Sequence, residues 1–181
     1  MDLEEGDLVF EFSDPWNVLK LDEHSDYRER IAKLEGTKAV DFLGIFDEAL
    51  YLIEVKDFRD YRIENKDRLV SGELAIEVGQ KVRDSLACVV GAYRTSSEPE
   101  TWTPFVRLLS DKRKAVKVVL WLEHDLPAHR LARRKVKASV ETQVFKKKLN
   151  WLTSQVLVCN LAANTLSGVQ VRNLPHSHVG A

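Results

Sequence analysis

The sequence predicts a mixed α/β protein, a three-layer sandwich with a central mixed β-sheet. Strand-like runs of β-branched and aromatic residues alternate with stretches whose apolar residues recur at a helical period. The run at 116–123 is apolar almost throughout, as in strands that are buried on both faces. A chain of 181 residues fits one domain of ~150 residues. We therefore expect a single domain over 1–181, with its core at about 14–160 and a peripheral segment at 161–181.

The first elements are a short strand at 8–12 and a helix. Ser13-Asp14-Pro15 is typical of a helix start, because a capping side chain precedes a proline at the first helical position. Apolar residues then follow one helical stripe as far as Gly36. A break at 22–25 would divide this stretch into two short helices, so one or two helices remain open.

A β-hairpin should follow the helix. Two strand-like runs, 38–46 and 50–58, flank a short polar turn at 47–49. The polar residues at 57–72 then indicate a loop or flap. The later elements are expected in this order: a helix over 73–93, a loop over 96–104, a short helix over 102–109, a strand over 116–123, a helix over 133–152, a strand over 155–160 and an edge strand over 168–173.

The hairpin places two carboxylates opposite each other. If its turn centres between Asp47 and Glu48, residues whose numbers sum to 95 are paired, and Asp41 then faces Glu54 with Cβ atoms ~5 Å apart. Two carboxylates this close repel each other unless a proton or a cation lies between them. A hard divalent ion such as Mg²⁺ suits them, and Lys56, one pleat beyond Glu54, would reach the same place.

The alternative is a surface hairpin whose charged residues are solvated neighbours. Leu43, Ile45 and Leu52 count against it, because they make the face shared with Glu54 and Lys56 otherwise apolar. Charged groups on a face that points into the core are seldom left without a partner or a task. We therefore expect a working site.

This pattern resembles the active-site signature of the PD-(D/E)xK nuclease superfamily, which has the restriction-endonuclease-like fold. The resemblance covers roughly residues 14–122, in both the motif and the order of elements. It implies that Asp41 and Glu54 bind one or two Mg²⁺ or Mn²⁺ ions and that Lys56 positions the attacking water and steadies charge on the phosphate. Val40 stands where the family name has proline.

The resemblance also implies two further site residues. Many members add a carboxylate from the first helix, and Glu23 lies on the apolar stripe of that predicted helix, whereas Glu29 points away from it. A helix break near residue 22 would instead make Glu23 a first-turn acid favoured by the helix dipole. Some members carry Gln or Lys on the helix after the hairpin. Lys81 flanks the apolar stripe there and is the better candidate, since Gln80 lies nearly opposite it.

Charge is unevenly distributed along the chain. Residues 1–60 hold 7 Lys and Arg against 17 Asp and Glu, while residues 107–148 hold 13 against 4. This asymmetry is compatible with solvated faces that merely differ, or with a polyanion-binding surface. The run at 146–148 fans around a helix and favours solvation. The residues predicted to contact nucleic acid are Arg59, Arg62, Lys81, Lys112, Arg113, Arg133 and Arg134.

Several functional classes are disfavoured. The sequence has no apolar run near the ~20 residues of a membrane span, no paired histidine motif for zinc and no Gly-rich phosphate loop. Cys88 and Cys159 lie in apolar runs, which predicts buried reduced thiols and a cytoplasmic protein.

We therefore expect a metal-dependent nuclease acting on DNA, as the resemblance implies, and a homodimer stays open. A catalytically silent nucleic-acid-binding or assembly subunit with the same fold is the alternative. A metal-dependent enzyme acting on a small phosphorylated substrate has no motif to support it.

Overall fold

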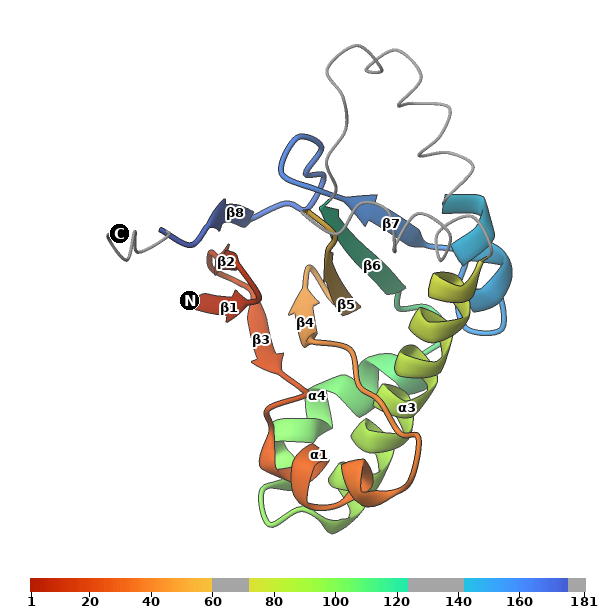
Figure 1. Ribbon diagram of the computed structural model, residues 1–181. Coiled ribbons are helices and arrows are strands. Elements are labelled where there is room, and N and C mark those ends of the chain that lie inside the picture. Colours follow the sequence, from red (N-terminus) through yellow and green to blue (C-terminus); the bar gives the residue numbers. More distant parts are fainter. Residues whose placement is uncertain (60–71, 124–141, 176–181) are drawn as a thin grey trace.

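A computed structural model describes residues 1–59, 72–123 and 142–175 of the chain. In these parts a five-stranded mixed sheet carries helices on one face and a second, three-stranded sheet on the other (Figure 1). The chain is thus mixed α/β with a central mixed sheet, as the sequence predicts. No helix in these ranges is long and apolar enough to cross a membrane.

The central sheet has the order β3-β4-β5-β6-β7. Its strands are β3 (Asn17–Lys20), β4 (Phe42–Phe46), β5 (Ala49–Asp57), β6 (Val116–Glu123) and β7 (Val156–Cys159). Strands β3, β4 and β5 pair antiparallel, and β5, β6 and β7 pair parallel. Parallel neighbours need a crossover connection, and the chain accordingly passes through helices between β5 and β6 and again before β7.

The helical layer covers one face of this sheet (Figure 1). Its described elements are α1 (Ser25–Glu29), the short 3-10 helix η1 (Ile31–Lys33), α3 (Glu73–Thr95), α4 (Pro99–Ser110) and the helical residues 142–149. In α3, Leu74, Val78, Val82 and Val89 recur at intervals of four and seven residues and are buried, so one stripe of the helix lies on the sheet.

The second sheet combines both ends of the described chain. It has the order β1-β2-β8, made of β1 (Asp2–Glu5), β2 (Leu8–Phe12) and β8 (Val169–Asn173), all antiparallel. Phe10 at its centre contacts the rings of Phe42 and Trp121 in the central sheet. Strands that lie outside the predicted 14–160 core therefore supply a layer of their own.

Alternation along β5 assigns its side chains to the two faces. Leu50 and Leu52 belong to the core beneath the helices, whereas Tyr51 and Ile53 belong to the core beneath the second sheet. Because side chains alternate along a strand, Glu54 and Lys56 continue the helix-covered face. The central sheet thus brings both motif residues under α3.

The predicted hairpin register is confirmed, but the predicted helix after Ser13 is wrong. The pairs Phe42↔Ile53 and Phe46↔Ala49 both sum to 95. In place of a helix from residue 15, the chain has a cis Asp14-Pro15 bond and then β3, which pairs with β4. Long-range pairing with β4 overrides the local capping signal there, and helical structure starts only at Ser25. The break near residues 22–25 therefore exists, but only the part that follows it is helical.

Packing around Trp16 holds β3 in place. The indole stacks on Phe46 and contacts Tyr51, and its Nε1 donates to the Ser167 carbonyl at 2.9 Å. Gly44 permits this, because a Cβ there would lie 2.8 Å from an indole carbon. Both cysteines, as expected, are buried and unbridged.

Candidate active site

Asp41 immediately precedes β4, and continuing the hairpin register by one residue beyond Phe42↔Ile53 places it opposite Glu54. Its side chain is 5% exposed, and its Oδ2 accepts a hydrogen bond of 2.6 Å from the Val55 backbone N–H. The carboxylate thus accepts a hydrogen bond from a backbone N–H of β5, two residues beyond Ile53, the last β5 residue that pairs with β4. This bond fixes the Asp41 side chain to the sheet itself.

Glu54 is fully buried and paired with two lysines. Its Oε1 lies 2.7 Å from the ammonium of Lys81 and 3.1 Å from that of Lys56. Lys81 also lies 3.6 Å from Asp41 Oδ1. Neither Glu54 oxygen has a hydrogen-bond partner of good geometry among the described residues, and the ion-pair distances to the two lysines involve Oε1. One carboxylate oxygen therefore stays available to a ligand inside the protein.

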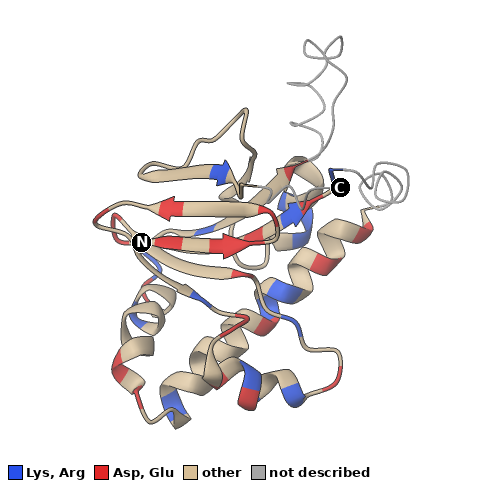
Figure 2. Ribbon diagram, turned by 60° about the vertical axis from the view of Figure 1, so that its left-hand side comes forward, with Lys and Arg blue, Asp and Glu red and all other residues tan. Residues whose placement is uncertain are grey.

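Helix α3 supplies two charged residues of the site, Lys81 and Glu77. Lys81 and Glu77 are four residues apart and so lie on the same helix face, and Glu77 is 3.0 Å from the Lys56 ammonium. In Figure 2 acidic residues near the start of α3 are followed by basic residues along the helix. The sequence prediction included Lys81 but missed Glu77, although its four-residue spacing from Lys81 was a usable signal.

Burial dominates the electrostatics of the pair. Burial, together with the nearby Glu54 carboxylate, raises the pKa of Asp41 to about 7. Burial also raises the pKa of Glu54, although Lys81 and Lys56 oppose the shift. For Lys81, burial favours the neutral amine, but the two carboxylates outweigh it and raise its pKa. Asp41 therefore binds a proton readily near neutral pH unless a cation takes its place.

A second group of carboxylates adjoins Asp41. Oxygen atoms of Glu5, Asp22 and Asp41 all lie within 4.8 Å of one another. Glu5 ends β1, and Asp22 comes two residues after β3. Asp22 Oδ1 is buried without a hydrogen-bond partner among the described residues, and burial and Glu5 raise the pKa of this carboxyl. This set of oxygen donors, with one orphaned oxygen, fits a hard divalent ion such as Mg²⁺ or Mn²⁺.

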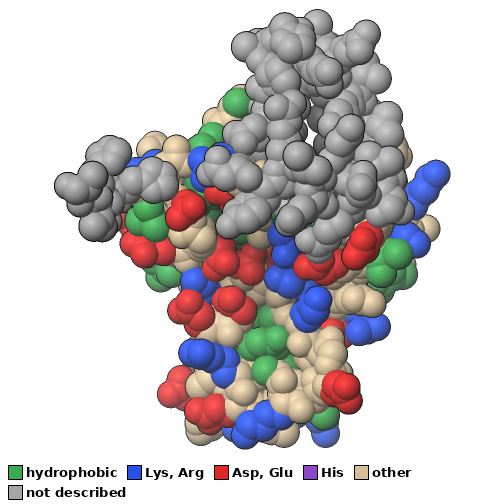
Figure 3. Space-filling model, viewed as in Figure 1, with side chains coloured by type: hydrophobic (Ala, Val, Ile, Leu, Met, Phe, Trp, Pro, Cys, Tyr) green, Lys and Arg blue, Asp and Glu red, His purple; other side chains and the backbone are tan. Residues whose placement is uncertain are grey.

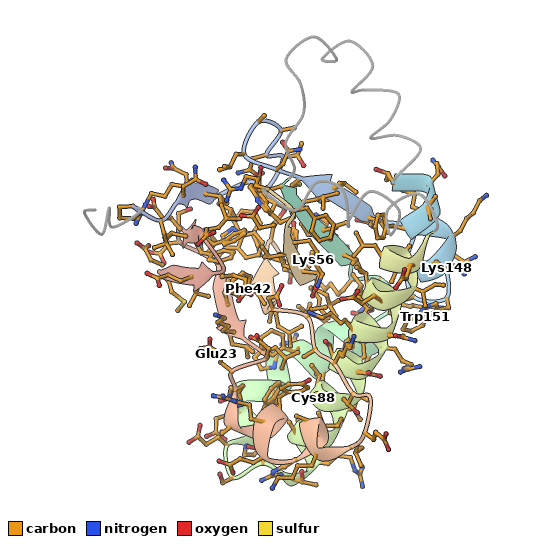
Figure 4. All side chains as sticks on the ribbon, viewed as in Figure 1. Glu23, Phe42, Lys56, Cys88, Lys148 and Trp151 are labelled. Atoms are coloured by element: carbon orange, nitrogen blue, oxygen red, sulfur yellow. The ribbon has the colours of Figure 1, made fainter. Side chains whose placement is uncertain are left out.

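The structure does not bring Glu23 to this group. Its carboxylate is 2.8 Å from the Lys20 ammonium, and its side chain is 60% exposed (Figure 4). Lys20 also holds Glu5 at 3.0 Å. The prediction for Glu23 depended on a helical stripe, and residues 17–20 are a strand instead. The adjacent Asp22 occupies the place beside Asp41, and the sequence reasoning missed both Asp22 and Glu5.

The predicted nucleic-acid contacts divide into three groups. Lys81 lies in the site itself. Arg59 forms an ion pair with Asp57, which faces the other side of the sheet from Lys56. The remaining residues are away from the site or undescribed: exposed Lys112 and Arg113 precede β6 at the opposite end of the sheet, and Arg62, Arg133 and Arg134 lie outside the described residues.

The separation of Lys112 and Arg113 from the site follows from the strand register. Val116, which begins β6, pairs with Leu50, six residues before Lys56. Six residues of strand span about 20 Å. Arg113 is also engaged by Asp111 at 2.8 Å. Figure 3 shows that acidic and basic side chains intermix on the face it displays, without a uniform basic surface.

Stability should respond to pH through Asp41. A carboxyl whose folded pKa is raised to about 7 from 3.8 binds a proton more tightly when folded, so the free energy of unfolding falls as pH rises from about 4 to about 7. The contribution of Asp41 to this fall in the free energy of unfolding is at most about 1.4 kcal/mol per pH unit. In EDTA, Asp41→Asn should abolish that contribution. Urea unfolding from pH 4 to pH 8 measures it.

The matched control is Asp47→Asn, the same change at an exposed turn residue with positive φ, a conformation that Asn tolerates well. The relevant quantity is the difference between variant and parent, because carboxyls with lowered pKa, such as Asp26, contribute the opposite slope. Parallel pH profiles for the parent and Asp41→Asn would contradict the expectation.

Comparisons with known proteins add little beyond this geometry. No protein-family model matches the chain, and no solved structure matches it. A curated relative, the Cysteine--tRNA ligase of Neisseria meningitidis, is 28% identical over 142 residues, which cover 64% of this chain and 20% of the ligase. The chain therefore spans about a fifth of that relative, and the partial similarity does not establish a family.

Proposed function

We propose that this protein is a metal-dependent phosphodiester hydrolase that acts on nucleic acid, with DNA as the substrate. The observation that carries the proposal is the buried pair of Asp41 and Glu54 on paired strands, with Lys56 one pleat further on and 3.1 Å from Glu54. Buried ionisable groups with raised pKa values that gather at one place are typical of functional sites.

The fold supports the same proposal. A hairpin and a parallel strand form the centre of a mixed sheet, with α3 and α4 crossing between β5 and β6. This order is compatible with a restriction-endonuclease-like fold, and the positions of Asp41 just before β4 and of Glu54 and Lys56 on β5 support the resemblance to the PD-(D/E)xK superfamily. We propose this fold and family for the chain.

In this proposal the carboxylates hold the metal and the lysines serve the phosphate. Asp41, Asp22 and Glu5 would hold a Mg²⁺ or Mn²⁺ ion, and Glu54 lies close to Asp41 through their shared neighbour Lys81. The bound ion supplies Lewis-acid polarisation of the phosphate and lowers the pKa of a water molecule. Lys56 orients the attacking water and, as a compact positive charge, stabilises the charge that develops on the phosphate.

A second candidate function is a silent nucleic-acid-binding or assembly subunit. The observation that favours it is the Lys81 ammonium, which lies 2.7 Å from Glu54 and 3.6 Å from Asp41. Such a charge already neutralises the pair and opposes a second cation. Under the nuclease proposal Lys81 turns to the scissile phosphate when the metal binds, whereas in a silent subunit it stays where it is.

A cleavage assay separates the two candidates. Plasmid DNA, single-stranded DNA and a structured RNA are incubated with the protein in Mg²⁺, Mn²⁺ or EDTA. The RNA is included because the partial relative is named for a tRNA. We expect cleavage of DNA with metal and none in EDTA. Asp41→Asn should lose it, and Asp47→Asn should keep it. If the purified parent cleaves none of the three with either metal, the hydrolase proposal is wrong.

A further inference from the structure

A hollow of about 320 Å³ lies between α3 and the segment that ends at Trp151. Its lining includes Ile76, Gly79, Gln80, Arg83, Lys148 and Trp151. Two of the lining side chains are cationic and none is acidic. The volume is at the lower end of the ~300–1,000 Å³ range of ligand clefts. The hollow is therefore large enough to hold one planar ring system together with the charged groups attached to that ring.

Close helix packing fixes the walls of this groove. A Cβ on Gly79 would lie 3.8 Å from the Lys148 carbonyl oxygen, and one on Gly72 would lie 3.7 Å from Val144. The same segment is anchored below by Phe145 and Leu149, both buried in the helix-side core. Trp151 is thus presented by a segment that is held at several points.

The aromatic and charged groups of the groove face outwards. Trp151 is 54% exposed and Ile76 is 46% exposed. Arg83 donates from Nε to Asp84 at 2.8 Å, which holds its guanidinium beside the groove. Figure 4 shows Lys148 and Trp151 together at the α3 side of the molecule, apart from Lys56.

Helix geometry relates the groove to the candidate active site. Ile76, Gly79 and Arg83 share one face of α3, since they are three and four residues apart. At 100° per residue, Gly79 and Arg83 point away from the direction of Lys81 by about 160°. A helix with side chains is about 10–12 Å across. The groove and the site therefore lie on opposite sides of one helix, within a few nucleotides of each other.

We propose that this groove binds unpaired nucleotides of a single-stranded nucleic acid. Trp151 stacks on a base, and Lys148 and Arg83 contact the adjoining phosphates. A rigid exposed aromatic ring flanked by cations is the recurring element of single-strand recognition, because every base has a π-face and every linkage carries a negative charge. As a substrate subsite the groove rests on the proposed function, whereas as a binding site it does not.

Self-association through this groove is the competing explanation, because Ile76 and Trp151 expose apolar surface. The cations argue against it. In a symmetric pair the same patch meets itself, which would bring the Lys148 ammonium groups of two copies towards each other with no acidic lining residue between them, whereas Arg83 is already paired with Asp84. A polyanion, in contrast, matches their charge.

The test measures binding without catalysis. Fluorescence anisotropy of a labelled 20-residue oligothymidylate is recorded in EDTA at low salt. The same measurement is made with a blunt duplex, and sedimentation gives the mass of each protein. Trp151→Ala should weaken single-strand binding by about 5- to 150-fold, equivalent to about 1–3 kcal/mol per stacked base. Trp151→Phe, which keeps a stacking ring, should lose less.

Two matched controls isolate the groove. Lys148→Gln should weaken single-strand binding, whereas Lys147→Gln, the same change at the adjacent exposed residue outside the lining, should not. Tyr93→Ala removes another exposed α3 aromatic and should leave binding unchanged. Thermal melts check that every variant is folded.

The outcomes separate this proposal from the proposed function. Parent-like single-strand affinity in Trp151→Ala, or no oligonucleotide binding by the parent, overturns the groove proposal. A dimer that Trp151→Ala converts to a monomer with unchanged oligonucleotide affinity also overturns it and identifies a self-association surface. Groove-dependent binding without cleavage in the separate metal assay supports the groove and contradicts the hydrolase. Metal-dependent cleavage by the parent, together with unaltered oligonucleotide binding in Trp151→Ala, supports the hydrolase and contradicts the groove proposal.

Discussion

Lys56→Ala should cut metal-dependent cleavage at least about 100-fold, a loss of about 2.7 kcal/mol of transition-state stabilisation. A metal site by itself has no need of an ammonium beside it, because positive charge opposes cation binding. A hydrolase needs one to hold the water and to stabilise the developing charge. Metal affinity should therefore stay the same or improve. Single-turnover cleavage and Mg²⁺-induced shifts in Tm measure the two quantities.

The control for this variant is Lys114→Ala. Lys114 pairs with Glu48 at 2.7 Å at the other end of the sheet, so its removal should leave cleavage unchanged. Lys56→Arg should restore little activity, because a planar guanidinium does not replace a compact charge. Cleavage by Lys56→Ala at the parent rate would remove the most specific element of the resemblance to PD-(D/E)xK nucleases.

Lys81→Met should lower the free energy of unfolding by about 3 kcal/mol at pH 8 in EDTA. Lys81 is 14% exposed and is the cation nearest to both buried carboxylates, so its loss leaves buried negative charge without compensation. The loss should shrink at pH 5.5, where Asp41, with a pKa of about 7, binds a proton. Urea unfolding at the two pH values measures the effect.

Mg²⁺ provides a further check on Lys81→Met. An added ion can take over the neutralising role, so the stabilisation by Mg²⁺ should be larger in this variant than in the parent. Lys147→Met, an exposed change outside the site, should shift stability by less than about 0.5 kcal/mol. Equal unfolding free energies for Lys81→Met and the parent at pH 8 would show that Lys81 is not the counter-ion of the pair.

The hairpin register was predictable because it depends on local rules. A short turn and the alternation of side chains fix which residues pair, and Phe42↔Ile53 follows. Lys81 became a candidate through the family resemblance, and its place at the edge of the apolar stripe of α3 then distinguished it from Gln80. The register and this choice between neighbours both depend on spacing within one hairpin or one helix.

The rest of the acidic group could not be derived in this way. Glu5 reaches Asp41 from β1 of the second sheet, and Asp22 does so at the end of β3. Both placements depend on how strands far apart in the chain pair and stack. One or two helices over residues 15–36 were predicted from an apolar stripe and a capping signal worth about 1 kcal/mol, which the pairing of β3 with β4 outweighs. The prediction of Glu23 as a metal ligand depended on that predicted helix and is therefore also wrong.

The second sheet also sets the order in which the acidic group can assemble. Glu5 lies in β1, and its neighbour β2 pairs on its far side with β8, Leu8 facing Asn173. A two-stranded hairpin is at best marginally stable alone, so β1 and β2 depend on the packing of Phe10 against the central sheet and on the pairing with β8, which is complete only after residues 169–173 have left the ribosome. A growing chain therefore carries Asp41, Glu54 and Lys56 long before Glu5 is secured beside them. In a hydrolase built this way, the carboxylates that hold the metal are brought together only after residues 169–173 have been synthesised.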